Sequence, residues 1–300
     1  MGSSLDLYTA HFGLSERPFS LVPDPGFLFW SDTHARAFSM LEYGILTRAP
    51  ITLITGEVGT GKTTLIHRLI ATTRDDVTIG LVANAHGDRH ELLRWVLLAL
   101  GQPVEPNAHY VDLYGQFQQY LVAEYAAGRR VVLIFDEAQN LTRDVLEELR
   151  MFTNINSGKD ELLQLMIIGQ PELRDVVMRP DLKQFAQRVA ASFHLPEMDQ
   201  RDVAAFIAHR LQVAGRDTPI FDADAIAAIY EATRGVPRLV NQLCDLALVY
   251  AFTMDRQDVD ARVIAQILKD GVFFGGGQLR DTASFVRTRV GAASPAPVTG

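Results

Sequence analysis

The octapeptide Gly56-Glu57-Val58-Gly59-Thr60-Gly61-Lys62-Thr63 constrains this chain more than any other feature. It fits the pattern G-x-x-x-x-G-K-[ST] and directly follows the β-branched run Ile51–Thr55. Glycines allow a backbone path in which successive N–H groups point inward at phosphate oxygens. A helix that starts near Lys62 would add its positive N-terminal end. The segment therefore predicts a strand, a phosphate-binding loop and a helix.

Two residues of this segment carry the chemistry expected around a nucleoside triphosphate. Lys62 would bring a mobile cation to the outer phosphates, and the Thr63 hydroxyl would ligate Mg²⁺. A glycine-rich turn without a ligand is the alternative. The pattern arises by chance in a chain of this length on the order of one time in a hundred at ordinary residue frequencies. We therefore expect ATP and Mg²⁺ as cofactors, with the loop from Gly56 to Thr64 holding the nucleotide.

A second apolar run, Val131–Phe135, ends in the carboxylates Asp136 and Glu137. Asp136 at a strand tip would hold the metal shell, and Glu137 would act as general base for an attacking water. Binding a phosphate needs only the first acid, so the second one suggests turnover. In isolation, an Asp-Glu pair at a strand end is commonly just solvated. Together with the phosphate loop, it predicts an ATP hydrolase.

The run Leu163–Ile168 is followed by Gly169-Gln170-Pro171-Glu172. A polar side chain at this strand end would contact both the γ-phosphate and the attacking water, and this sensing role suits Gln170. By itself, Gln170 is equally well a turn residue.

The apolar runs predict an α/β fold of the P-loop type, with a parallel sheet flanked by helices and a small all-helical lid after it. The expected strands are Ile51–Thr55, Val77–Ala83, Val131–Phe135, Leu163–Ile168 and the weaker Val189–Leu195, with helical periodicity between them, as in Glu91–Leu100 and Val145–Phe152. After Pro196 the strand signals stop, and helices are expected over 199–213, 222–233, 236–253 and 258–269, with N-terminal carboxylates near Asp222 and Asp258.

We accordingly expect four parts along the chain. Residues 1–49 form an N-terminal segment packed on the ATPase core, 50–196 the α/β domain and 197–270 the helical lid. Residues 271–300 run from a glycine-rich stretch to Ser294-Pro295-Ala296-Pro297 and are expected to be a disordered tail.

The formal charge of −8 and the pI of about 5.5 argue against a general attraction to nucleic acid or anionic lipid. The first ten residues lack a secretory signal pattern, and no apolar run reaches the roughly 18 residues that span a bilayer. We therefore expect a cytoplasmic protein without direct membrane insertion, recruited to the inner membrane, if at all, through partners.

With these motifs in view, the chain resembles the ExeA/GspA-type AAA+ ATPases of bacterial secretion and envelope systems. It looks especially similar to the branch associated with exosortase and exopolysaccharide loci. The similarity runs from about Phe12 to Ala251. Besides the phosphate loop, it rests on Phe12-Gly13-Leu14, Pro18-Phe19, Pro23-Asp24-Pro25, Phe27-Leu28-Phe29, Tyr43-Gly44, Phe135-Asp136-Glu137-Ala138-Gln139-Asn140-Leu141, Leu146-Glu147-Glu148-Leu149-Arg150, Gly169-Gln170-Pro171-Glu172-Leu173, Gln187-Arg188, Gly235-Val236-Pro237-Arg238 and Asn241.

The resemblance implies a two-part AAA+ module that works as a homo-oligomer. Arg188 matches the arginine that reaches the γ-phosphate of a neighbouring subunit, with Arg179 as a nearby competitor, and Arg238 matches the second sensor in the lid. A surface salt bridge worth about 0–1 kcal/mol is the alternative for each arginine. The stretch Phe12–Phe29 would pack beside the adenine, or its aromatics are ordinary core residues.

Three functions remain open at this level. The first is an ATPase that powers or regulates a secretion, envelope or exopolysaccharide export machine. Many secretion members continue into a membrane span and a peptidoglycan-binding region that this sequence does not show, so contact with the envelope is expected through partner proteins. The second is a DNA-associated regulator like the target-selection ATPases of transposons, against which the acidic charge argues. The third is a nucleotide-gated scaffold that hydrolyses slowly.

Overall fold

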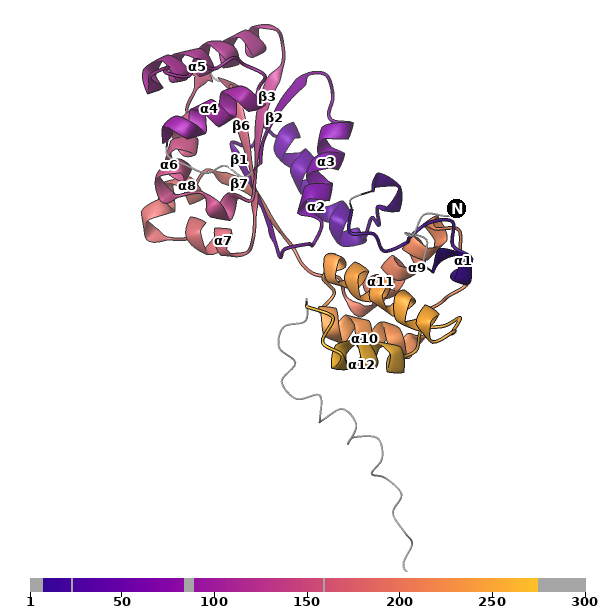
Figure 1. Cartoon of the computed structure of the whole chain (residues 1–300). Coiled ribbons are helices and arrows are strands. Elements are labelled where there is room, and N and C mark those ends of the chain that lie inside the picture. The colour runs from indigo at the N-terminus through magenta and orange to yellow at the C-terminus, as the bar shows by residue number, and fades with distance from the viewer. Residues whose placement is uncertain (1–7, 23, 84–88, 159, 275–300) are drawn as a thin grey trace, which may run out of the picture.

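The computed structural model describes residues 8–22, 24–83, 89–158 and 160–274. It has two lobes, one built on a sheet and one helical, joined near residue 196 (Figure 1). The α-helices are α1 Thr9–Phe12, α2 Asp32–Leu46, α3 Lys62–Thr72, α4 Arg89–Ala99, α5 Tyr110–Ala126, α6 Arg143–Phe152, α7 Glu172–Val177, α8 Lys183–Ala186, α9 Gln200–Val213, α10 Ala223–Thr233, α11 Pro237–Thr253 and α12 Ala261–Lys269. Short 3-10 helices are η1 Pro25–Phe27, η2 Ala138–Asn140 and η3 Pro180–Leu182.

The main sheet is fully parallel and has the strand order β2-β3-β6-β1-β7. Its strands are β1 Ile51–Gly56, β2 Val77–Ala83, β3 Arg130–Asp136, β6 Leu163–Gly169 and β7 Val189–Leu195, and a small antiparallel hairpin joins β4 Asn156–Ser157 to β5 Asp160–Glu161. All five expected strands are present within one residue at each end. The predicted fold class, a P-loop α/β sheet followed by a helical lid, is confirmed.

Both faces of the sheet are covered, which explains why its strands read as continuous apolar runs. Because side chains alternate along a strand, Leu133 and Phe135 point into the core under α4, α5 and α6, whereas Val132 and Ile134 point into the core under α2 and α3. Figure 1 shows these two helical layers on opposite sides of the strands. The parallel arrangement brings the carboxyl ends of β1, β3 and β6 to one edge.

The helical lobe consists of α9 to α12 around its own core. Asp199, Asp222 and Asp260 accept hydrogen bonds from backbone N–H groups in the first turns of α9, α10 and α12, so aspartate caps begin three of its helices. The cap that was expected near Asp258 is Asp260. None of the described helices is both long and apolar enough to cross a bilayer.

The N-terminal segment differs from the expectation that all of it packs on the α/β part. Its later part does so, through Trp30 and through Leu41 and Ile45 of α2. Tyr8, Phe12 and Phe19 lie instead in the core of the helical lobe, where Tyr8 donates to Asp245 of α11 and the ring of Phe19 packs edge-on against Phe221. Their backbone is held there by arginines of that lobe: Arg210 donates to Pro18 O, and Arg216 to Phe12 O. The aromatic stretch is therefore core rather than a free surface beside a ligand. Of the tail expected over 271–300, all but the first four residues lie outside the described residues.

Candidate functional site

The phosphate loop lies between the end of β1 and the start of α3, at the carboxyl edge of the sheet. Gly59 and Gly61 have φ angles of 83° and 101°, in the left-handed region that favours glycine. Space also requires glycine: a Cβ at Gly59 would lie 2.7 Å from Arg238 Cβ, and one at Gly61 would lie 2.7 Å from His34 Nε2. The loop is therefore held against both the lid and α2, and side chains are excluded from its turn.

Lys62 is buried, and its ammonium donates to two carbonyls of the same loop. The distances are 2.7 Å to Gly56 O and 2.8 Å to Glu57 O. Burial lowers the pKa of Lys62, and the nearby carboxylates of Glu137 and Asp136 oppose this shift. The ammonium is thus placed inside the loop on carbonyls that phosphate oxygens can replace as partners.

Thr63 and Asp136 meet across two elements. The Thr63 hydroxyl, in the first turn of α3, donates to Asp136 Oδ2 over 3.3 Å, and Asp136 Oδ1 accepts from the Glu137 backbone N–H at 2.9 Å. Burial raises the pKa of the Asp136 carboxyl, and the neighbouring Glu137 carboxylate adds to this, whereas the Glu137 N–H, Thr63 and Lys62 lower it. A buried carboxylate beside a hydroxyl is an oxygen donor set that fits Mg²⁺. Thr64, next in α3, is half-buried.

Glu137 follows Asp136 with a φ of 54°, an uncommon conformation for a residue other than glycine. Its Oε2 accepts from Gln139 Nε2 at 2.6 Å and from Gln170 Nε2 at 3.4 Å. The structure thus brings Gln170, at the end of β6, to the carboxylate at the end of β3, as expected for residues at the tips of neighbouring parallel strands.

The lid meets the loop at the start of α11. Arg238 is in the first turn of α11, next to Gly59. A cavity of about 470 Å³ lies between the lobes, beside the first residues of the loop. It is lined by Glu57, Val58, Glu197, Ala232, Thr233, Arg234, Val236, Arg238 and Leu239. The cavity is next to the loop and is walled by three larger apolar side chains, Val58, Val236 and Leu239.

Arg188 lies at the opposite edge of the sheet from the loop. It immediately precedes β7, whose Val189 pairs with Ile51 and whose Leu195 pairs with Gly56. At about 3.3 Å per residue, the length of β7 separates Arg188 from its own loop by roughly 20 Å. Its guanidinium donates to Glu161 Oε1 at 3.3 Å and to the Asn154 side chain. Arg188 therefore cannot act on the nucleotide site of its own chain.

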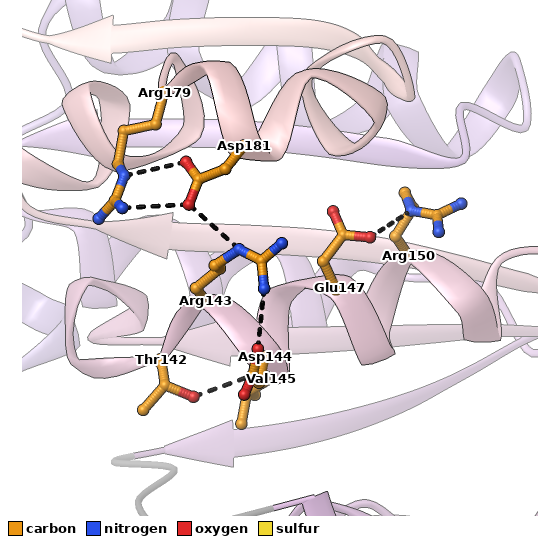
Figure 2. A network of polar contacts seen from close by, with 8 residues as sticks. All are labelled: Thr142, Arg143, Asp144, Val145, Glu147, Arg150, Arg179 and Asp181. Atoms are coloured by element: carbon orange, nitrogen blue, oxygen red, sulfur yellow. Dashed lines mark hydrogen bonds and ion pairs between the residues drawn. The ribbon is translucent and has the colours of Figure 1, made fainter.

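Arg179 is also engaged within the chain. Both Nε and an Nη of Arg179 donate to Asp181 at 3.1 Å, and the same carboxylate takes Arg143 Nε at 3.1 Å (Figure 2). Figure 2 also shows Arg150 paired with Glu147 on α6 and the Thr142 cap of that helix. Half of the Arg179 side chain is exposed, so this group lies at the surface beside α6.

Two residues near the site were not assigned a role from the sequence. His34, on α2, is buried with Nε2 3.1 Å from Thr60 O and Nδ1 2.8 Å from Ser31 Oγ. Gln139 joins Glu137 to the backbone of Gln170. Gln139 lies within Phe135–Leu141, one of the motifs that carry the family resemblance, and this motif could have pointed to it. Nothing in the sequence links His34 to a loop residue 26 positions later.

Comparisons with known proteins agree with this geometry. The AAA domain family model matches residues 46–177. General secretion pathway protein A of Aeromonas hydrophila is 40% identical over 246 residues, which are 82% of this chain and 45% of that protein. The chain thus spans less than half the length of this curated relative.

Solved structures share the fold at low identity. The Aeropyrum pernix ORC2 protein in its ADPNP-ADP complexes matches with a TM-score of 0.62 and 19% identity, over 85% of this chain and 71% of that one. Cdc6p from Pyrobaculum aerophilum matches with a TM-score of 0.64 and 16% identity, over 87% of this chain and 72% of that one. Residues 46–177 belong to the AAA domain family, the chain has the AAA+ P-loop fold, and it is similar to general secretion pathway protein A over 82% of its length.

Proposed function

We propose that this protein binds ATP with Mg²⁺ between its two lobes and hydrolyses it as a homo-oligomer. The observation that carries this proposal is the convergence of Lys62, Thr63 and Asp136 with the carboxylate of Glu137 at one edge of the sheet. A phosphate-binding loop, a metal-binding pair and a candidate base are the minimal set for phosphoryl transfer to water.

The nucleotide is proposed to lie across the loop, with its base toward the lid. The apolar side chains of Val58, Val236 and Leu239 suit a purine ring, and their cavity adjoins the loop. Backbone N–H groups of the loop and the Lys62 ammonium would hold the phosphates. Arg238 in the lid would add a positive charge when the lobes close on the bound triphosphate.

Each site residue then has a chemical task. When bound, Mg²⁺ neutralises charge on the outer phosphates, with Thr63 and Asp136 as its protein ligands. Glu137 accepts a proton from the water that attacks the γ-phosphorus. Gln170, already within reach of Glu137, orients that water and contacts the γ-phosphate.

Assembly would complete the site. Arg188 lies at the far edge of the sheet from its own loop, which supports a role at the site of a neighbouring subunit. A guanidinium that arrives from a second subunit neutralises charge that develops only in the transition state. Hydrolysis is therefore expected to rise with subunit association.

The similarity to general secretion pathway protein A also suggests which cellular machinery the ATPase serves. General secretion pathway protein A is named for secretion, so we propose secretion, envelope or exopolysaccharide export machinery as the partner. The protein would then work in the cytoplasm, where ATP is available, and partner proteins would recruit it to the inner membrane.

Steady-state phosphate release tests the enzymatic part. We expect the wild type to turn over in Mg-ATP, and both Lys62→Ala and Glu137→Gln to fall by at least about 100-fold. Lys269→Ala and Glu231→Gln change exposed residues of the helical lobe in the same way and are the matched controls.

The binding step separates the two roles. Glu137→Gln should still bind Mg-ATP, because it leaves the loop and metal pair intact, whereas Lys62→Ala should not. Wild-type turnover in both variants would refute hydrolysis at this site. A wild type that binds Mg-ATP tightly but releases no phosphate in the assembled state would favour a nucleotide-gated scaffold.

A further inference from the structure

Gln139 connects the tips of two neighbouring strands. It lies in η2, directly after β3, and its side chain is half-buried. The amide nitrogen donates to Glu137 Oε2 at 2.6 Å, and the amide oxygen accepts the backbone N–H of Gln170 at 3.0 Å. One side chain thus touches both the candidate base and the backbone of the candidate sensor.

The orientation of this amide is fixed by its two partners. A flipped amide would set its oxygen against the Glu137 carboxylate and its NH₂ group against the Gln170 N–H, so both contacts would become repulsive. The fit is also close: a Cβ at Gly169 would lie 2.8 Å from Gln139 Oε1 and 3.1 Å from the Gln139 backbone nitrogen. The absence of a side chain at Gly169 therefore leaves room for the Gln139 side chain.

The two hydrogen bonds of the Gln139 side chain act on Glu137, whose carboxylate the backbone alone does not fix. Glu137 stands at a φ of 54°, after the last residue of β3, and its carboxylate is at the end of a flexible side chain. The amide hydrogen bonds from Gln139 and Gln170 both fall on Oε2. The second oxygen, Oε1, is then the one left to accept a proton from water.

We propose that Gln139 is a positioning residue that sets the Glu137 carboxylate for hydrolysis and ties it to the strand end carrying Gln170. A movement of Gln170 on contact with the γ-phosphate is thereby passed to the base through one amide. The inference rests on the proposed ATP hydrolysis and adds a residue to it. Gln139 does not touch the nucleotide, so its effect falls on turnover and not on binding.

Gln139→Leu, which keeps the volume but removes both polar contacts, is the first test. We expect kcat to fall by about 10- to 100-fold, the cost of misplacing a reacting group by about 1 Å, with the Kd for Mg-ATP and the KM within twofold of wild type. Gln119→Leu, at an exposed position of α5, is the matched control and should keep wild-type kcat. Unchanged Mg-ATP affinity shows that the fold is intact.

Gln139→Glu keeps an acceptor for the Gln170 N–H but sets a second carboxylate against Glu137 Oε2. The like charges should push the two carboxylates apart, so kcat should fall while the KM and the Kd for Mg-ATP stay within twofold of wild type. This split between kcat and KM is a signature that a purely structural role would not give. Gly169→Ala pushes on the same amide and should lower kcat in the same direction as Gln139→Leu.

The outcomes separate this inference from the function on which it rests. Wild-type kcat in Gln139→Leu or in Gln139→Glu, or a fall in Mg-ATP affinity that accounts for the whole loss of turnover, would overturn the positioning role alone. A wild type without ATP turnover would overturn the proposed hydrolysis, and this inference with it.

Discussion

The Thr63 hydroxyl donates to Asp136 Oδ2 across 3.3 Å, although the two residues are 73 positions apart in the chain. The contact joins the first turn of α3 to the end of β3. It exists because β1 and β3 belong to one parallel sheet, so the loops that follow these strands leave from the same edge. The same edge carries Glu137 and Gln170, so the candidate metal pair and the candidate hydrolytic pair adjoin each other.

Asp136→Asn should weaken nucleotide binding only when metal is present. Removing the charged metal ligand is expected to raise the Kd for Mg-ATP by about tenfold, or ~1.4 kcal/mol. In chelator the affinity should stay the same or improve, because one negative charge near the phosphates is lost. Titrations with a fluorescent ATP analogue in the two buffers measure this, with the exposed Asp144→Asn as control. Equal weakening with and without metal would argue against a metal role for Asp136.

His34 should make stability depend on pH. Burial lowers its pKa from the ordinary value of 6.5, and this outweighs the Thr60 carbonyl and the distant charge of Asp202, both of which raise it. The unfolded chain therefore binds the proton first as the pH falls. The stabilisation is complete above pH 6.5 and is lost as the pH drops below that value toward the folded pKa.

Chemical denaturation of His34→Gln at pH 7.5 and pH 5.5 tests this, since glutamine keeps a donor for Thr60 O but does not titrate in this range. We expect a clearly smaller loss of the free energy of unfolding at low pH in the variant than in wild type. His67→Gln, exposed on α3, is the control and should keep the wild-type loss. The same pH dependence in all three proteins would remove His34 as its source.

Gly235→Ala should destabilise the junction between the lobes. Gly235 has a φ of 75°, and an added Cβ would lie 1.9 Å from Met198 O, in the link between β7 and α9. We expect a loss of more than about 1 kcal/mol in the free energy of unfolding. Gly115→Ala is the contrasting variant: within α5, where nothing lies near an added Cβ, it should gain about 0.5–1 kcal/mol. Thermal melts in which Gly235→Ala and Gly115→Ala change the stability equally would contradict a steric requirement for glycine at position 235.

Arg188 can be tested by mixing subunits. Arg188→Ala should hydrolyse poorly, because each site lacks its neighbour's guanidinium, and Lys62→Ala should be inactive because it lacks the loop cation. A mixture should recover activity, since an intact loop then meets an intact Arg188 from the other variant. Arg179→Ala is run in parallel. Recovery with Arg179→Ala but not with Arg188→Ala would transfer the role to Arg179, and no recovery in either mixture would refute a site shared between subunits.

The strands and the phosphate loop could be predicted from the sequence because their signals are local. Val131–Phe135 is apolar at every position since both sheet faces are buried, and the loop glycines follow from backbone geometry. The roles of His34 and Gln139 depend instead on tertiary neighbours, Thr60 and the Gln170 backbone, which no local pattern specifies.

The aromatic N-terminal stretch shows the same limit. Phe12 and Phe19 could be seen to need burial, but not in which lobe, because two cores compete for apolar rings. Arg210 and Arg216 hold the backbone of this stretch against the helical lobe, and these contacts connect residues about 200 positions apart, which no local pattern specifies.

Equilibrium titration of the Glu137→Gln variant with Mg-ATP, by calorimetry and without turnover, tests the central claim most directly. Saturable binding of one nucleotide per chain, abolished when Lys62→Ala is added and kept when Lys269→Ala is added instead, is the predicted result. Failure to bind Mg-ATP, or equal affinity with and without Lys62, would contradict the account.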